Sequence, residues 1–173
     1  QKRPQQRGRF FCLVHLVLKS IKTMTVTEAI KKIEYFCAYQ ERCHKEVVEK
    51  LKSYGMFNQA IDHIVGHLIK ENYLNEERFS KSFARGKFRT KQWGKNRIVN
   101  GLRFRGITTF NIQLALKEIS EEEYLKTLDT LAKKRFTEIK ETHLQKKKKK
   151  IADYLLYRGW ESHLVYGKIK ELV

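Results

Sequence analysis

Hydrophobic positions recur along this chain with a period of about fifty residues. Three segments each carry an aliphatic residue, a leucine four positions later and a glycine four positions after that, and the glycines are Gly55, Gly106 and Gly159. Further apolar residues follow each glycine at matching offsets. A fixed period of this size is the signature of one supersecondary unit repeated in tandem. The pattern therefore predicts three copies of one unit.

Within each copy the apolar positions have the spacing of amphipathic helices. In the first copy, Val47, Val48 and Leu51 fall on one face of a helix, while charged residues occupy most of the remaining surface. No stretch of convincing length alternates with the period of two that a half-buried strand requires. We therefore expect an all-α fold of three tandem three-helix repeats that form an elongated, curved, right-handed helical array.

The expected boundaries follow the copies. Residues 24–74, 75–121 and 122–173 form the three repeats, and residues 1–23 form an N-terminal extension. In the extension a basic stretch precedes an apolar run at 10–18, which is too short to span a bilayer and lacks a small-residue cleavage site after it. It is either part of a signal peptide or a sequence upstream of a native start at Met24. We favour the start at Met24, with an extension that is non-native or disordered.

The glycines of the pattern have a predicted structural role. Gly55, Gly106 and Gly159 each stand where the middle helix of a copy ends. The residue after a helix end often adopts the left-handed conformation, which only glycine enters without steric cost. We expect all three glycines to be structural caps with positive φ.

The charge of the chain indicates which classes of partner it attracts. A net charge of +18 over 173 residues attracts polyanions, with nucleic acid first, anionic membrane second and acidic protein surfaces third. The cysteines Cys12, Cys37 and Cys43 are odd in number and form no CxxC motif. This usage disfavours a disulfide scaffold and predicts a reducing, cytoplasmic location.

Much of the positive charge lies in one tract. No acidic residue occurs between Glu77 and Glu118, so the tract lacks the glutamates that a solvated helix would carry for i, i+4 pairing. A charge run is usually a solvated face. The missing acids favour instead a face that binds a polyanion. The predicted basic face consists of Arg78, Lys81, Arg85, Lys87, Arg89, Lys91, Lys95, Arg97, Arg103 and Arg105.

Aromatic residues alternate with these cations. Phe88, Trp93 and Phe104 can either stack on unpaired bases or pack within the protein, and for each residue taken singly packing is the more frequent role. The run of lysines at 146–150 is either a flexible, solvated connection before the last middle helix or a phosphate contact without sequence readout.

Enzyme-like patterns are weak. His63 and His67 have a metal-compatible i, i+4 spacing, but no third ligand lies nearby in the sequence. Cys37 falls in an apolar helix stripe, which favours packing over nucleophilic chemistry. No phosphate-binding GxxxxGK[ST] loop occurs. We therefore expect no metal, no cofactor and no catalysis.

Two motifs resemble a known family. The first runs from Glu41 through Gly55 and continues at 72–79, and the second runs from Trp93-Gly94-Lys95 to Gly106. Both resemble the RecX family of recombination regulators, with departures at 43–44 and at Asn72. The likeness covers essentially residues 25–173. It implies a non-enzymatic protein that binds the RecA–DNA filament and restrains recombination.

Two functions therefore remain open. The first is a monomeric regulator that binds the RecA filament and contacts single- or double-stranded DNA directly or through the filament. The second is a sequence-independent nucleic-acid-binding protein, for which the charge of +18 alone would suffice. Neither requires a membrane. Binding to bare and to RecA-coated DNA distinguishes the two.

Overall fold

The computed structural model describes residues 24–172, and every regular element in this range is an α-helix. Our expectations for residues 1–23 lie outside the described residues. The helices are α2 (Val26–Tyr39), α3 (His44–Ser53), α4 (Asn58–Lys70), α5 (Glu76–Lys91), α6 (Lys95–Phe104), α7 (Thr109–Leu116), α8 (Glu121–Glu138), α9 (Leu144–Tyr157) and α10 (Ser162–Leu172).

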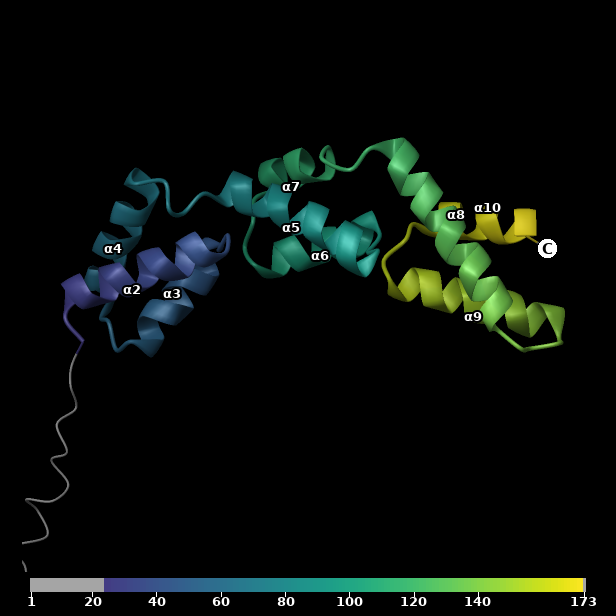
Figure 1. Ribbon diagram of the computed structural model, residues 1–173, viewed down its shortest axis with the longest axis horizontal. Coiled ribbons are helices and arrows are strands. Elements are labelled where there is room, and N and C mark those ends of the chain that lie inside the picture. The colour runs from purple at the N-terminus through teal and green to yellow at the C-terminus, as the bar shows by residue number, and fades with distance from the viewer. Residues whose placement is uncertain (1–23, 173) are drawn as a thin grey trace, which may run out of the picture.

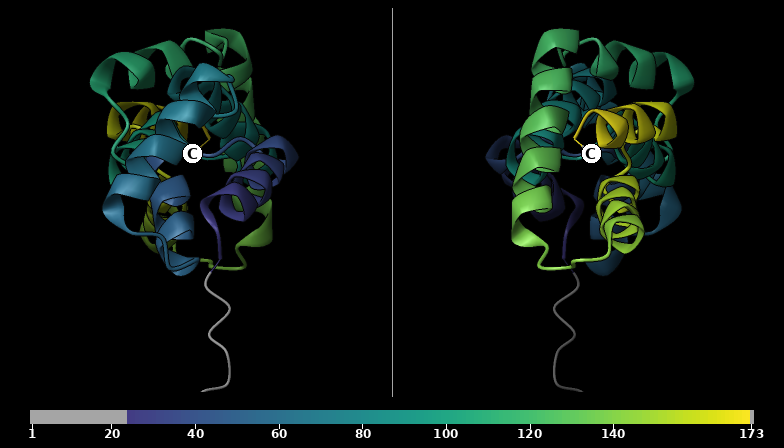
Figure 2. Two further views of the ribbon diagram at one scale, coloured as in Figure 1. Left: turned by 90° about the vertical axis from the view of Figure 1, so that its left-hand side faces the viewer. Right: turned by 90° about the vertical axis from the view of Figure 1, so that its right-hand side faces the viewer.

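The helices form three groups, which we call the first unit (α2–α4), the second unit (α5–α7) and the third unit (α8–α10). Figure 1 shows the units following one another along an arched row, and in the end-on views of Figure 2 they overlap. The predicted all-α array of three-helix repeats, elongated and curved, is confirmed. None of the helices between residues 24 and 172 combines the length and apolar character needed to cross a bilayer.

Side chains at the helix starts explain where the units begin. The Thr25 hydroxyl accepts a hydrogen bond from the Glu28 backbone N–H at 3.2 Å, and the Glu28 carboxylate accepts one from the Thr25 N–H at 3.0 Å. Asn75 caps α5 and Ser120 caps α8 through similar bonds to the third residue of each helix. Each cap satisfies a backbone donor that the helix leaves unpaired.

The three repeated glycines end the middle helices α3, α6 and α9. Gly55, Gly106 and Gly159 have φ angles of 79°, 78° and 84°. In each case the glycine N–H donates to the carbonyl three residues before the glycine. The N–H of the residue after the glycine donates to the carbonyl four residues before the glycine. This is the Schellman arrangement, and it requires a left-handed residue at the glycine position. The repeated phrase therefore encodes one helix ending used three times.

The apolar residues form two separate cores. One lies within the first unit and includes Ile33, Leu51 and Leu68. The other is continuous through the second and third units, and Cys43 from the start of α3 packs against it. The second and third units therefore share a core, whereas the first unit has its own.

Aromatic stacking joins the second unit to the third. The Tyr124 ring of α8 lies between Phe88 and Trp160, with centroid distances of 5.8 Å and 4.4 Å. The Tyr124 hydroxyl donates to the Glu161 carboxylate at 2.5 Å and accepts from the Lys95 N–H at 2.8 Å. A buried tyrosine needs such partners, and here they fix the angle between the units.

The two backbones also touch at this junction. The Gly94 N–H donates to the Arg158 carbonyl at 2.9 Å, and the Asn96 N–H donates to the Gly159 carbonyl at 3.1 Å. A Cβ atom on Gly94 would lie only 2.3 Å from the Gly159 oxygen, so this position requires glycine. The junction is consequently a close-packed, hydrogen-bonded contact.

Candidate interaction surface

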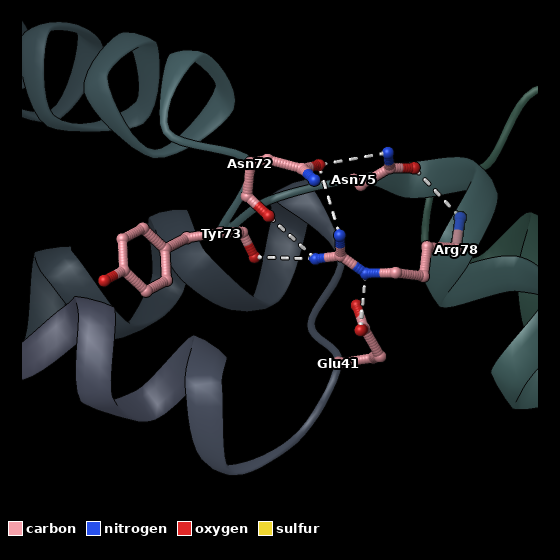
Figure 3. Close-up of polar contacts among 5 residues, drawn as sticks. All are labelled: Glu41, Asn72, Tyr73, Asn75 and Arg78. Atoms are coloured by element: carbon pink, nitrogen blue, oxygen red, sulfur yellow. Dashed lines mark hydrogen bonds and ion pairs between the residues drawn. The ribbon is translucent and has the colours of Figure 1, made fainter.

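Arg78 connects the first unit to the second. Asn75 caps the start of α5, which places Arg78 in the first turn, facing the α2–α3 loop (Figure 3). The Arg78 Nε donates to Glu41 Oε1 at 2.6 Å, while its two terminal nitrogens donate to the Asn72 side-chain oxygen at 3.1 Å and to the Asn72 carbonyl at 2.9 Å. Asn72 has a φ of 57°, a left-handed conformation that asparagine tolerates better than most residues. Arg78 therefore links the first unit to the second through its side-chain hydrogen bonds.

A second set of polar contacts joins the end of α6 to the start of α3. Arg105 Nε is 3.3 Å from Glu46 Oε1, and an Arg105 terminal nitrogen donates to the Gly101 carbonyl at 2.9 Å. The Lys45 ammonium donates to the Phe104 carbonyl at 3.2 Å and lies 4.3 Å from the centre of the Phe104 ring. The junction between the first and second units thus depends mainly on partly exposed charged pairs, in contrast with the aromatic junction that follows it.

Other cations of the predicted face pair with acids at the edges of the tract. Lys81 lies 2.8 Å from Glu77 and 3.7 Å from Glu118, and Arg85 lies 2.8 Å from Glu118. The hydrogen bond that the Lys81 ammonium donates to the Glu77 carboxylate raises the pKa of Lys81, so this lysine stays charged. Lys95 pairs with Glu121 at 2.8 Å. These acids come from the ends of the tract.

Arg97 is held by aromatic rings and a carbonyl. Its guanidinium carbon lies 4.5 Å from the centre of the Trp93 ring and 4.7 Å from that of the Tyr157 ring. A terminal nitrogen of Arg97 donates to the Tyr157 carbonyl at 2.9 Å. Tyr157 belongs to α9, so Arg97 links the second unit to the third.

These contacts correct the expectation of an uncompensated basic face. The tract lacks acids, but Glu41 and Glu46 from the first unit, with Glu77, Glu118 and Glu121 at its borders, neutralise half of the predicted cations. Four of these acids lie outside the helix of the cation they pair with, and sequence reasoning sought pairing only within one helix. Glu77 pairs with Lys81 at i, i+4 inside α5, but it stands at the edge of the tract and was counted as its border. Acids close to the unit boundaries were the available signal.

A smaller set of cations remains without acidic partners. Arg89, Lys91 and Arg103 are exposed and have no side-chain hydrogen bond or ion pair within residues 24–172. Lys87 lies above the Phe83 and Trp93 rings at 5.3 and 5.4 Å. We call Lys87, Arg89, Lys91 and Arg103 the unpaired cations.

The aromatic candidates separate by exposure. Phe88 is only 3% exposed and packs on Tyr124, so the prediction that it can stack on a base is wrong. Trp93 is half-buried, edge-on to Phe83 at 6.4 Å, and covered by cations. The Phe104 ring is 75% exposed, with Lys45 near one face. Of these three, Phe104 is the most open to a partner.

The structure contradicts one of the two interpretations of the lysine run, that of a flexible connection. Residues 146–150 lie inside α9, in its first and second turns, so they are not a flexible connection before that helix. Lys147 lies 3.9 Å from the centre of the Phe136 ring, and Lys150 pairs with Glu141 at 2.9 Å. Contact with phosphates stays a prediction for the exposed members.

The metal and thiol candidates have structural partners. His67 Nε2 is 2.7 Å from Glu34 Oε1, which ties α4 to α2, and the described part of the chain contains no group of three residues that could hold a metal ion. Burial raises the pKa of the Cys37 thiol from 9.0 to about 11 and also raises that of Cys43. Neutral, buried thiols are poor nucleophiles.

Family models match the second and third units. A model of the second three-helix domain of RecX matches residues 75–116, and a model of the third matches residues 121–168. Together they span more than half of the chain.

Similar proteins carry the same family name. A protein named "Regulatory protein RecX" from Streptococcus uberis is 31% identical over 103 residues, covering 59% of this chain and 40% of its own length. Another with this name, from Oceanobacillus iheyensis, is 25% identical over 149 residues, covering 86% and 54%. The chain spans about half the length of the curated relatives it matches.

Solved structures agree in fold. A crystal structure of RecX from Lactobacillus salivarius has a TM-score of 0.74 at 25% identity, covering 85% of this chain and 96% of that one. A crystal structure of regulatory protein RecX has a TM-score of 0.75 at 24% identity, covering 84% and 71%. With its three units, its repeated helix endings and both family models matched, this chain belongs to the RecX family.

Proposed function

We propose that this protein binds the RecA nucleoprotein filament and lowers RecA-dependent ATP hydrolysis and strand exchange, without catalysis of its own. Family membership is the observation that carries the proposal, because the likeness to RecX implies RecA as the partner. The arched row of units supports it (Figure 1), since a long body can touch more than one subunit of a filament.

The arrangement of the units gives this binding a physical basis. The second and third units share one core, so their contact sites keep a fixed spacing. Several weak sites on one rigid body bind together with high effective concentration, which favours a filament over free RecA subunits. A monomer is sufficient for this mode, and we place it in the cytoplasm with its RecA partner.

The unpaired cations are the part of the basic face that we assign to the filament. Arg89, Lys91 and Arg103 do not have to leave an acidic partner before they meet a phosphate or an acidic protein surface. Paired cations such as Arg78 would lose an intramolecular ion pair to do so. Binding should therefore depend more on the first set, and it should weaken as salt screens the charges.

A second candidate function is sequence-independent nucleic-acid binding, which the net charge of +18 favours. The two functions are separated by measuring affinity for single-stranded DNA, bare and coated with RecA, at one salt concentration. We expect tighter binding to the coated DNA. Equal or tighter binding to bare DNA would favour the second function.

A charge-reversal variant localises the interaction. Arg89→Glu, Lys91→Glu and Arg103→Glu together should weaken filament binding by tenfold or more, because attraction becomes repulsion at these positions. The matched control reverses Lys70, Lys126 and Lys170, which are exposed and lie on other units, and so produces the same net charge. Equal loss in both variants would mean that only the overall charge matters.

A further inference from the structure

The outer face of α2 is unusual for a solvent-exposed helix surface. Tyr35 and Tyr39 are 74% and 77% exposed, and Phe36 lies between them, half-buried. With Lys32 they have the i, i+3, i+4, i+7 spacing of one helix face, which is separate from the buried stripe of Ala29 and Ile33. The helix thus carries an aromatic stripe in addition to its core stripe.

The stripe borders a shallow hollow. An open depression of about 380 Å³ is lined by Lys31, Lys32, Tyr35, Phe36, Tyr39 and Tyr54. Tyr54 comes from the end of α3, so two helices build the surface. The lining contains cations and aromatic rings and no acidic or aliphatic side chain. We call these six residues the aromatic–lysine face.

Cations surround the inner rings, and the outer rings are free. Lys50 Nζ lies 5.2 Å from the centre of the Tyr54 ring, and Lys32 Nζ lies 6.0 Å from it. Arg42 covers Phe36 at 3.9 Å, which holds that ring in place. Among the described residues, Tyr35 and Tyr39 have no hydrogen bond, ring contact or cation partner. Their faces are available to a ligand.

The composition of the face favours one class of partner. A groove for an apolar protein helix is lined by aliphatic side chains, whereas exposed rings with lysines suit bases that stack and phosphates that pair. Tyr35 and Tyr39 are one helical turn apart, about 6 Å along the axis, so successive bases can use successive rings. Glu28, on the same stripe towards the helix start, is engaged in the cap with Thr25.

We propose that the aromatic–lysine face binds single-stranded nucleic acid by stacking unpaired bases on Tyr35 and Tyr39, with Lys31 and Lys32 contacting the phosphates. The site lies on the first unit, away from the unpaired cations of the second. It goes beyond the proposed filament binding and gives the second candidate function a defined site on α2 and α3. The sequence did not indicate this site, since polyanion-binding residues were sought only in the acid-free tract and in the lysine run at 146–150.

The test measures affinity for a fluorescently labelled oligothymidylate without RecA. Replacing Tyr35 and Tyr39 together by Ala should weaken binding at least tenfold, because each stacked base contributes on the order of a five- to hundredfold gain in affinity. Tyr35→Phe with Tyr39→Phe keeps the rings and should keep the affinity. Tyr166→Ala, which removes an exposed tyrosine of α10, is the matched control and should have no effect.

An abasic oligonucleotide of equal length isolates the stacking. It should bind the native protein and the double Ala variant equally, since it presents phosphates without bases. Equal weakening on the abasic strand would overturn the proposal, and so would unchanged affinity for oligothymidylate. A third contrary result is a variant that loses binding to anionic phospholipid vesicles but keeps oligothymidylate affinity, which would make lipid the partner.

A measurement on the native chain covers the case in which the variant does not fold. Photo-cross-linking with halogenated uracil in the oligonucleotide should attach the strand at Tyr35 or Tyr39, as located by mass spectrometry. Cross-links confined to the second and third units would contradict the proposal. The assay contains no RecA, so its failure would leave the proposed filament function standing.

Discussion

At the scale of single residues, glycines with similar φ angles have different surroundings. A Cβ on Gly106 would meet nothing within 4 Å, whereas a Cβ on Gly159 would lie 2.3 Å from the Arg97 Cβ. Gly106 is thus required by backbone conformation alone. Gly159 is required by conformation and by the contact between units.

Substitutions should separate these two requirements. Gly106→Ala should lower the free energy of unfolding by about 1–2 kcal/mol, the cost of left-handed backbone for an L-residue. Gly159→Ala should cost more, because the added atom also pushes against Arg97. Urea denaturation measures both. Gly66→Ala is the control, since this helical glycine has open space and should gain about 0.5–1 kcal/mol. Equal losses of stability in Gly106→Ala and Gly159→Ala would contradict the contact between Gly159 and Arg97.

Cys37 gives the stability of the first unit a pH dependence. Its folded pKa of about 11 lies above the 9.0 of a free thiol, because the fold favours the neutral form. The stabilising contribution is complete below pH 9 and is lost as the pH rises to about 11, by roughly 2 kcal/mol. The free energies of unfolding of the native protein and of Cys37→Ala, measured at several pH values, should therefore converge between pH 9 and pH 11. A constant difference between them would contradict a buried, neutral thiol.

At the scale of elements, α9 contains a conflict between sequence and helix. Lys146 stands in the first turn, where the helix dipole favours acids, and like charges follow at 149 and 150. The helices α5 and α8 carry glutamates at this place. The lysines of α9 are thus placed against the preference of the helix itself.

Replacing one of these lysines should stabilise the protein. Lys146→Glu places a favourable charge at the helix start and creates an i, i+4 pair with Lys150, so the free energy of unfolding should rise by about 0.5–1 kcal/mol at low salt. Thermal unfolding at two salt concentrations checks this, because screening should reduce the gain. Lys170→Glu near the end of α10 is the control and should not stabilise. A loss of stability in Lys146→Glu would show that this lysine has a structural role.

The elements also show which features the sequence could predict. The glycine phrase determined the helix ends because the Schellman ending depends on local residues alone. The pairing of Arg78 with Glu41 was beyond prediction, since it joins residues far apart that meet only when two units pack. Trp160 was missed for the same reason, because its stack on Tyr124 depends on the angle between units. Local conformation could be predicted from the sequence, whereas contacts between units could not.

At the scale of the whole molecule, the two junctions differ in kind. The first unit has its own core and joins the second mainly through the Arg78 and Arg105 ion pairs, with Cys43 as an apolar contact. The second and third units share a core and backbone hydrogen bonds. Partly exposed ion pairs weaken in salt, whereas apolar packing does not. We therefore expect the first unit to move more freely.

Hydrogen exchange should reveal this difference. Arg78→Met removes the side-chain hydrogen bonds between the first two units and leaves Glu41 unpaired. Amides of the first unit should then exchange faster, while those of the third unit stay protected. The control is Lys52→Met, an exposed lysine of the first unit without an acidic partner. Faster exchange throughout the chain would mean that all three units unfold as one.

The central claim concerns the RecA filament, and the rate of ATP hydrolysis by preformed RecA filaments on single-stranded DNA tests it most directly. With rising amounts of this protein at low salt, the rate should fall at equimolar or lower ratios and recover as salt is added. The variant carrying Arg89→Glu, Lys91→Glu and Arg103→Glu should inhibit less. An unchanged rate with excess native protein at low salt would contradict the claim and leave nucleic-acid binding as the function.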